Sequence, residues 1–537
     1  MKLFKRLNWL GLAMVATMMS ALTSCSSEDP VSSIPGNVDF AATVNLQKLM
    51  DVSQCRIENG DIKLPEEFSI YEQSIPDDVK AIIVDCYEAI DCSRIAVFGY
   101  IKLGTGADTY VVATLKDQKA LDEVLVEKGE LVKGDSDGYT TYEPESEYAE
   151  MAILVKNDLV WFVGGKRAKA AVKAVEKVKD KAGDKKLIDE KGLEEVITAD
   201  NLVNFSFNCT PVVTIIDQFA SFGMDPEQAV LLSSIISKVK GYWLTCSLDV
   251  KDKSFNTMAK FIKPGGEVLT CDLLQDIDPG FLTYVSNDYQ IVTAAGLNNK
   301  AINELVAKIR PLLNNMSGSD RQLAEMVLGW VSNIDGTMGI ACGADDFNRL
   351  MTGDDSQQNI NVLITLAMKP GKAKEMVSQI YNLVTLGMNE NDSVTLEADG
   401  SVVARFPGSP VIILKADGDN LLLSMNKITT GNANNEAAQV MKGAQMASYY
   451  NVASLSDITA GACTFGIKSE GRLVDGVATG TSEFTNCDMS LAEAIVKLCT
   501  SYYAAVRNNV YTEYAAEMAE ENYGIDDTTA VADDFAW

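Results

Sequence analysis

A pattern of apolar runs and polar breaks occurs twice along this chain, about 250 residues apart. A strand-like apolar run at 111–115 leads into a helix-like segment that reaches about residue 125. The same succession recurs at 364–380, where Lys369 aligns with Lys116. Recurrence of strand and helix in the same order over so long a spacing is typical of an internal duplication. We therefore expect two tandem copies of one structural unit.

Two hairpins follow the helix in each half of the sequence. Asp137-Gly138 and Asp399-Gly400 lie between strand-like runs, and Asp-Gly favours tight hairpin turns because glycine readily adopts positive φ. A second hairpin follows at 151–163 and again at 411–425. Hairpins with inserted helices, without regular β-α-β alternation, predict an α+β fold with a mainly antiparallel sheet. The predicted bounds are 38–270 for copy 1, 277–486 for copy 2, and 487–537 for a C-terminal helix and acidic tail.

The amino-terminal segment has the layout of a bacterial export signal. Basic residues precede an uncharged, mostly apolar run at 7–21, which is too short to span a bilayer. Leu22-Thr23-Ser24-Cys25 follows and resembles the lipobox of bacterial lipoproteins, in which the cysteine becomes the lipidated first residue. We predict a signal peptide at 1–24 and lipidation of Cys25. The alternative is an ordinary secreted protein in which this cysteine occurs by chance.

The residues after Cys25 indicate where the protein is located and how far its folded body lies from the membrane. Ser26-Ser27-Glu28-Asp29 resembles the signal that sends some Bacteroidetes lipoproteins to the outer face of the outer membrane; a solvated linker is the alternative. We expect residues 25–37 to form a tether, so that the predicted partner is the membrane, contacted through the lipid on Cys25. The expected location is the outer membrane, with the body at the cell surface or on the periplasmic face.

Charge and composition exclude several classes of function. The chain has 46 Lys plus Arg against 75 Asp plus Glu, a net charge of −29, and loss of the three basic leader residues takes it to −32. Such a surface repels phosphate backbones, so we expect no nucleic-acid partner. There is no histidine, which excludes Ser-His-Asp and Cys-His catalysis and histidine-bound zinc. We expect no catalytic residue, no cofactor and no metal site.

Three local motifs are better explained by structure than by chemistry. Ser237 and Lys240 have the SxxK spacing of serine-lysine acyl-enzymes, but none of the motifs that accompany it follows. The segment 133–144 contains part of a calcium-loop pattern, yet Pro144 stands where the bidentate glutamate belongs, which favours a hairpin. The acidic segment 345–355 is open to weak cation binding. None of these motifs predicts an enzyme.

Other positions are predicted to be structural. Trp161 and Trp243 lie in apolar runs and are expected in the core. Small and branched apolar residues recur at helical spacing in the lysine-rich stretch 166–186, which predicts an amphipathic surface helix. Most cysteines after Cys25 are expected to be buried thiols. The close pair Cys86 and Cys92 is open to a disulfide because the predicted compartment permits one.

The lipobox, the serine-and-acidic start, the entry through Ile34-Pro35 into 40–45, and the duplicated body together resemble a Bacteroidetes family of uncharacterised lipoproteins, classified only as a domain of unknown function. This resemblance implies a compartment and a fold but no activity. We interpret the chain as a lipid-anchored envelope protein that binds a partner or serves the envelope structurally, without enzymatic activity. The alternative is a surface lipoprotein that captures or processes glycans, for which exposed aromatic rings are expected.

Overall fold

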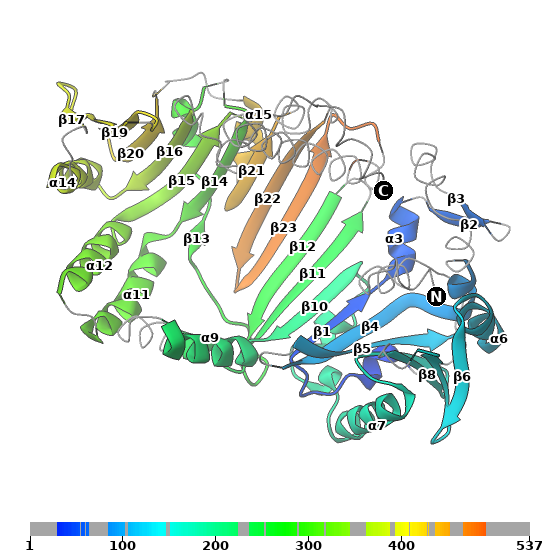
Figure 1. The fold of residues 1–537 in the computed structure, drawn as a ribbon. Coiled ribbons are helices and arrows are strands. Elements are labelled where there is room, and N and C mark those ends of the chain that lie inside the picture. The colour runs from blue at the N-terminus through cyan, green and yellow to red at the C-terminus, as the bar shows by residue number, and fades with distance from the viewer. Residues whose placement is uncertain are drawn as a thin grey trace, which may run out of the picture.

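A computed structural model gives the fold of the chain (Figure 1). It describes residues 29–489 and residue 494, apart from 54, 59–60, 64–83, 103–105, 147–150, 224–232, 234–235, 252–253, 287–288, 316–317, 344–360, 387–392, 408, 427, 429–434 and 452–464.

One antiparallel sheet extends across the molecule from β6 to β17 (Figure 1). Neighbouring strands of its first half are, in order, β6 (Leu131–Ser136), β7 (Tyr139–Pro144), β8 (Met151–Lys156), β9 (Leu159–Gly164), β5 (Gly106–Leu115), β4 (Ile90–Lys102), β1 (Phe40–Val44), β10 (Val203–Asn208), β11 (Trp243–Lys251) and β12 (Ser254–Ile262).

The second half of the sheet continues from the pairing of β12 with β23. Its strands follow in the order β23 (Val477–Thr485), β22 (Gly466–Val474), β21 (Met446–Tyr450), β14 (Ile291–Leu297), β15 (Ile334–Cys342), β16 (Val362–Met368), β20 (Asn420–Met425), β19 (Ile412–Asp417), β18 (Val402–Arg405) and β17 (Ser393–Leu396). Short β13 (Leu274–Gln275) pairs with the end of β14, and β2 (Arg56–Glu58) pairs with β3 (Asp61–Lys63) in a separate sheet. The prediction of an α+β fold with a mainly antiparallel sheet is confirmed.

Helices lie on both faces of the large sheet. One face carries η1 (Pro30–Ser33), α7 (Ala168–Asp184), η4 (Leu187–Asp189) and α8 (Glu194–Ile197) in the first half, and η6 (Pro279–Tyr284) and α15 (Asn435–Met441) in the second. The opposite face carries α3 (Leu46–Ser53), α6 (Gln118–Asp122) and the π-helix η3 (Glu123–Lys128) in the first half, and α14 (Lys372–Leu386) in the second. The remaining helices are α9 (Thr210–Gly223), η5 (Ser237–Val239), α11 (Asn299–Ile309), η7 (Arg310–Asn315) and α12 (Gly318–Val331).

Several predicted structural residues lie where the sequence places them. Trp161 and Trp243 are buried in the core of the first half. The lysine-rich stretch forms α7, which buries its Ala and Val positions and leaves the lysines toward solvent. The Asp137-Gly138 turn has positive φ at both residues and closes the β6–β7 hairpin, as the hairpin interpretation requires. None of the described helices has the length and apolar character needed to cross a bilayer.

The predicted tether is too long. Residues 25–37 were expected to be free of the body, but Pro30–Ser33 form η1, and Val31, Ile34 and Val38 are buried in the core. These apolar side chains stabilise the body by leaving water, and this outweighs the extended conformation that Pro and Ser favour locally. The folded body therefore includes Asp29, whereas the predicted C-terminal helix lies almost entirely outside the described residues.

Candidate functional site: an apolar cavity under helix α14

An apolar cavity of about 360 Å³ lies between α14 and the second half of the sheet. A volume of this order is at the lower end of the range for small-molecule sites. Strands β16, β18, β19 and β20 form its floor and α14 forms its roof. The side chains that line it are Ile364, Leu366, Met376, Ile380, Val384, Val402, Ala404, Phe406, Ile412, Leu414, Leu421 and Leu423. None is ionisable, so the cavity suits a hydrocarbon group and not a polar metabolite.

Local sequence sets α14 over this floor. Gly371 has φ +76°, a conformation that glycine adopts without steric cost, and its N–H donates to Asp419 Oδ1 at 2.8 Å. That bond ties the start of the helix to the β19–β20 turn. Met376, Ile380 and Val384 then recur every four residues and line one face of α14. The roof is therefore held at its first turn and contributes only apolar side chains to the cavity.

The first half of the sheet has the same row of cross-strand neighbours, but there the row carries aromatic rings that pack in the core. Adjacent strands of the second half contribute Ile364, Leu423, Leu414 and Val402 in register. At the corresponding strand positions the first half has Val111, Phe162, Ile153 and Tyr142. Two positions of the row differ in having a ring: Phe162 takes the place of Leu423, and at the end of the row Tyr142 takes the place of Val402. The Tyr142 ring is 0% exposed and belongs to the core beneath α6 and η3.

Polar partners hold the Tyr142 ring in the first half. Its hydroxyl donates to Asp122 Oδ1 at 2.5 Å and accepts from Gln118 Nε2 at 2.6 Å. Burial, followed by the hydrogen bond to Asp122 and the charge of that carboxylate, raises the pKa of Tyr142, so the ring stays neutral. A valine at this place has neither the ring volume nor the hydroxyl. The cavity of the second half thus coincides with two aliphatic side chains, Leu423 and Val402, in place of rings, together with the longer, uninterrupted α14.

A second hollow lies on the same face of the sheet, where the two halves meet. This open trough measures about 400 Å³ and follows β12, β23, β22, β21 and β14. Small side chains line it, among them Ala259, Ala295, Ala478, Gly471 and Gly480. Its hydroxyl groups bond to one another, as Ser469 Oγ and Ser482 Oγ do at 2.8 Å. The trough is more open to solvent than the cavity under α14, and its surface is mainly apolar.

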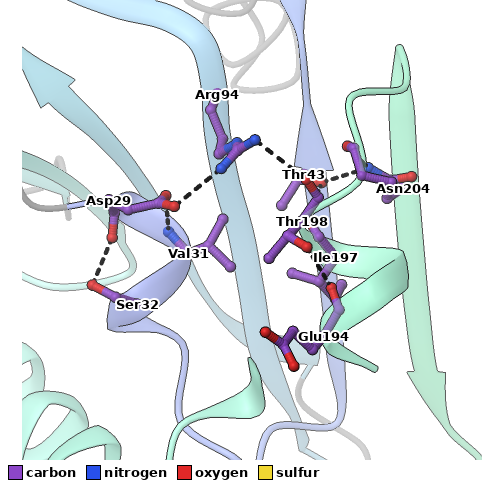
Figure 2. Close-up of polar contacts among 10 residues, drawn as sticks. Asp29, Val31, Ser32, Thr43, Arg94, Glu194, Ile197, Thr198 and Asn204 are labelled. Atoms are coloured by element: carbon purple, nitrogen blue, oxygen red, sulfur yellow. Dashed lines mark hydrogen bonds and ion pairs between the residues drawn. The ribbon is translucent and has the colours of Figure 1, made fainter. Parts of the chain in front are cut away.

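The start of the described chain is fixed to the first half of the sheet (Figure 2). Asp29 accepts from Val31 N at 3.0 Å and pairs with Arg94 Nη1 at 3.0 Å. Arg94 Nη2 also donates to Thr198 O, at 3.3 Å. Cys25 itself lies outside the described residues. Because it precedes Asp29 by four residues, at most ~14 Å of chain separates the predicted lipid site from this contact.

The SxxK residues lie at an exposed helix end. Ser237 begins the short helix η5 and Lys240 follows its end, and both side chains are exposed, as expected of a solvated helix end. The acidic segment 345–355 lies outside the described residues. Within the described part of the chain, no cluster of three metal-ligating side chains occurs. The apolar cavity was not anticipated, because its lining residues are ordinary core residues in the sequence.

The disulfide that the sequence left open between Cys86 and Cys92 is not formed. Cys86 is present as a thiol, packed against the same cluster that contains Cys92. Burial, and then the nearby Cys92 and Asp85, raise the pKa of the Cys86 thiol to about 12. A thiol with so high a pKa is unreactive at neutral pH, because only the thiolate attacks. The expectation that most cysteines are buried holds only in part: of the eight that the structure describes, Cys92, Cys209, Cys342 and Cys487 are buried, whereas Cys271 is exposed.

Comparison with known proteins adds little. No family model matches the chain, and no curated protein matches it. A solved structure titled "Structure of crystal form I of TP0453" is similar at 12% sequence identity and a TM-score of 0.25, over 45% of this chain and 82% of that chain. Likeness at this level carries no argument about the ligand or the activity of the chain. The resemblance to Bacteroidetes lipoproteins therefore stays a prediction.

Proposed function

We propose that the chain is a lipid-anchored envelope protein that holds the hydrocarbon chain of a lipid in the cavity under α14. The observation that carries the proposal is a comparison of Tyr142 with Val402, which hold equivalent positions in the two halves. At the same strand position one half of the sheet has a buried ring and the other has a valine beside an apolar space of about 360 Å³. Natural cores are closely packed, so an unfilled space of this size in one half points to a ligand.

The chemistry of the lining favours a hydrocarbon chain over a sugar. Twelve side chains line the cavity, of which eleven are aliphatic and one, Phe406, is aromatic. A glycan would need stacking rings and hydrogen-bond donors, but the large apolar side chains exposed in the described part of the chain include one aromatic ring, that of Phe261. We therefore place acyl-chain binding ahead of glycan capture, as a binding role without catalysis.

Lipid anchoring at Cys25 belongs to the same proposal. It is supported by the export leader and the lipobox resemblance, and by the ion pair that fixes Asp29 to Arg94. A linker of four residues would keep the body close to the bilayer that holds the lipid. The outer membrane is the proposed location, by virtue of the serine-and-acidic residues after Cys25.

We also propose that the two halves of the sheet are tandem copies of one unit. Both halves have strands that correspond one to one in order, and both have a register shift in the pairing of β4 with β5 and of β15 with β16. The junction supports this further. Thr257 pairs with Gly480, and each occupies the same place in its own hairpin, counted from the pairs Lys251–Ser254 and Val474–Val477. Two equal units related by a two-fold axis would pair in this way.

A fluorescent fatty acid tests the binding proposal. The chain from residue 25 onward, carrying Cys25→Ser so that no lipid is attached, is titrated with cis-parinaric acid, which fluoresces in apolar surroundings. We expect saturable binding at one site, and Val402→Phe should weaken it about tenfold or more because the ring occupies the cavity. The matched control is Val132→Phe, the same change at an exposed position of β6. Unchanged binding by Val402→Phe would refute the proposed site.

A further inference from the structure

Helices α12 and α14 lie at the end of the sheet that holds the cavity (Figure 1). Both expose large apolar side chains. Leu323 on α12 is 57% exposed and Leu386 on α14 is 86% exposed. Val327 and Leu383 are also exposed. We name these four side chains the α12–α14 patch. Soluble monomers rarely expose several large aliphatic side chains together unless they meet a partner.

Helical spacing and one hydrogen bond bring the four side chains together. Leu323, Val327 and Trp330 recur at i, i+4 and i+7, so they lie on one face of α12. Gln379, Leu383 and Leu386 have the same spacing on α14. Trp330 Nε1 donates to Gln379 Oε1 at 2.6 Å. This contact joins the two faces. Helix α12 has no buried residue, so its side chains stay at least partly exposed to solvent.

The α12–α14 patch is continuous with the cavity. Ile380 and Val384 line the cavity from α14. At 100° per residue, Leu383 lies on the helix surface between Ile380 and Leu386, at ~60° from each. Apolar side chains therefore lead around α14 from the patch toward the cavity, with Gln379 beside them, held by its hydrogen bond from Trp330.

Local charge matches an anionic surface. The whole chain carries −29, yet helices α11, α12 and α14 and the short helix η7 have six basic and four acidic side chains, of which Arg310–Glu325 and Lys372–Glu375 form ion pairs. The basic residues are Lys300, Lys308, Arg310, Arg321, Lys372 and Lys374. Amphipathic helices with basic residues beside an exposed apolar face bind at the interface of anionic bilayers. Elsewhere the chain's acidic surface disfavours such contact.

We propose that the α12–α14 patch docks on an anionic lipid bilayer and that the acyl chain enters the cavity there. Entry of the acyl chain rests on the proposed function, whereas bilayer docking rests on the α12–α14 patch and its charge. Leu323 and Leu386 enter the headgroup region, and the basic residues contact anionic headgroups. A bilayer fits this surface better than a protein partner, because a protein partner would not need the apolar path into the cavity.

Vesicle flotation tests the docking, with the Cys25→Ser chain so that no attached lipid contributes. Vesicles of phosphatidylglycerol and phosphatidylethanolamine are compared with vesicles of phosphatidylcholine. We expect flotation on the anionic vesicles, weaker by about tenfold on phosphatidylcholine and in high salt. Leu323→Glu with Leu386→Glu should lower the bound fraction at least tenfold. Val132→Glu, at an exposed site on β6, should leave it unchanged.

Two outcomes separate this proposal from the proposed function. The Leu323→Glu, Leu386→Glu chain should still bind cis-parinaric acid, and its melting temperature shows whether it folds. The Val402→Phe chain should still float. Docking is overturned if the wild-type sequence fails to float on anionic vesicles, or if the patch variant and Val132→Glu float equally. If flotation behaves as expected but Val402→Phe keeps full binding of the fatty acid, docking stands and the proposed function fails.

Discussion

Replacing Tyr142 with valine should recreate in the first half the space found in the second. Tyr142 is fully buried beneath α6 and η3, and its hydroxyl is bonded to Asp122 and Gln118. Removal of a buried ring costs 3–5 kcal/mol for aromatic-to-alanine changes, and valine keeps a branched stub, so we expect a loss of about 3 kcal/mol in the free energy of unfolding. The structure therefore predicts a large effect from one side chain.

Two companion variants divide that loss into parts. Tyr142→Phe keeps the ring and removes the hydroxyl, which should cost about 1 kcal/mol. Val402→Phe adds a ring where space exists, so the free energy of unfolding should stay unchanged or rise. If the core were closed there, the extra volume would instead cost 1–3 kcal/mol. Urea unfolding monitored by circular dichroism measures all three. The reasoning is wrong if Tyr142→Val costs less than about 1 kcal/mol, or if Val402→Phe destabilises as a closed core would.

Three further predictions concern positions outside the cavity lining. Gly371→Ala should cost about 1 kcal/mol in thermal unfolding, because φ is +76° there and an alanine side chain disfavours that conformation; no change would contradict the role given to that turn. The pKa of the Glu143 carboxyl is lowered, first by the hydrogen bond from Arg167. Its stabilisation is therefore present above the unfolded pKa of about 4.3 and lost as pH falls through the folded value. Arg167→Ala should flatten this part of the stability–pH curve, and an unaltered curve would refute the assignment. Arg94→Ala breaks the half-exposed ion pair to Asp29, so it should speed proteolysis near residue 29 while shifting the free energy of unfolding by about 1 kcal/mol or less; an unchanged cleavage rate would contradict the clamp.

Local patterns predicted the fold class well. Alternating runs and Asp-Gly turns mark the hairpins, since the turn residues have positive φ at Asp137 and Gly138. Trp161 and the apolar positions of α7 are buried as their spacing predicts. These features are visible in sequence because each depends on neighbours within a few residues. The pairing of β12 with β23 joins residues more than 200 positions apart, and no local pattern specifies it.

The candidate site was beyond the reach of sequence reasoning for a physical reason. A cavity is defined by what does not fill it, and Val402, Leu414 and Leu421 look like any other core residues. Only the cross-strand register shows that Val402 and Tyr142 hold the same place in two halves of one sheet. The long tether was mispredicted for a related reason. Pro30–Ser33 look like linker in composition, yet Val31 within this segment and Ile34 after it bury against distant strands.

Photo-crosslinking with a diazirine-bearing fatty acid tests the central claim most directly, because it reports where the hydrocarbon lies. After irradiation and proteolysis, mass spectrometry should find the label on peptides that contain 372–386 and 402–423, and Val402→Phe should remove it. Label confined to the trough between β12 and β23, or spread equally over the chain and unaffected by Val402→Phe, would contradict a lipid site under α14.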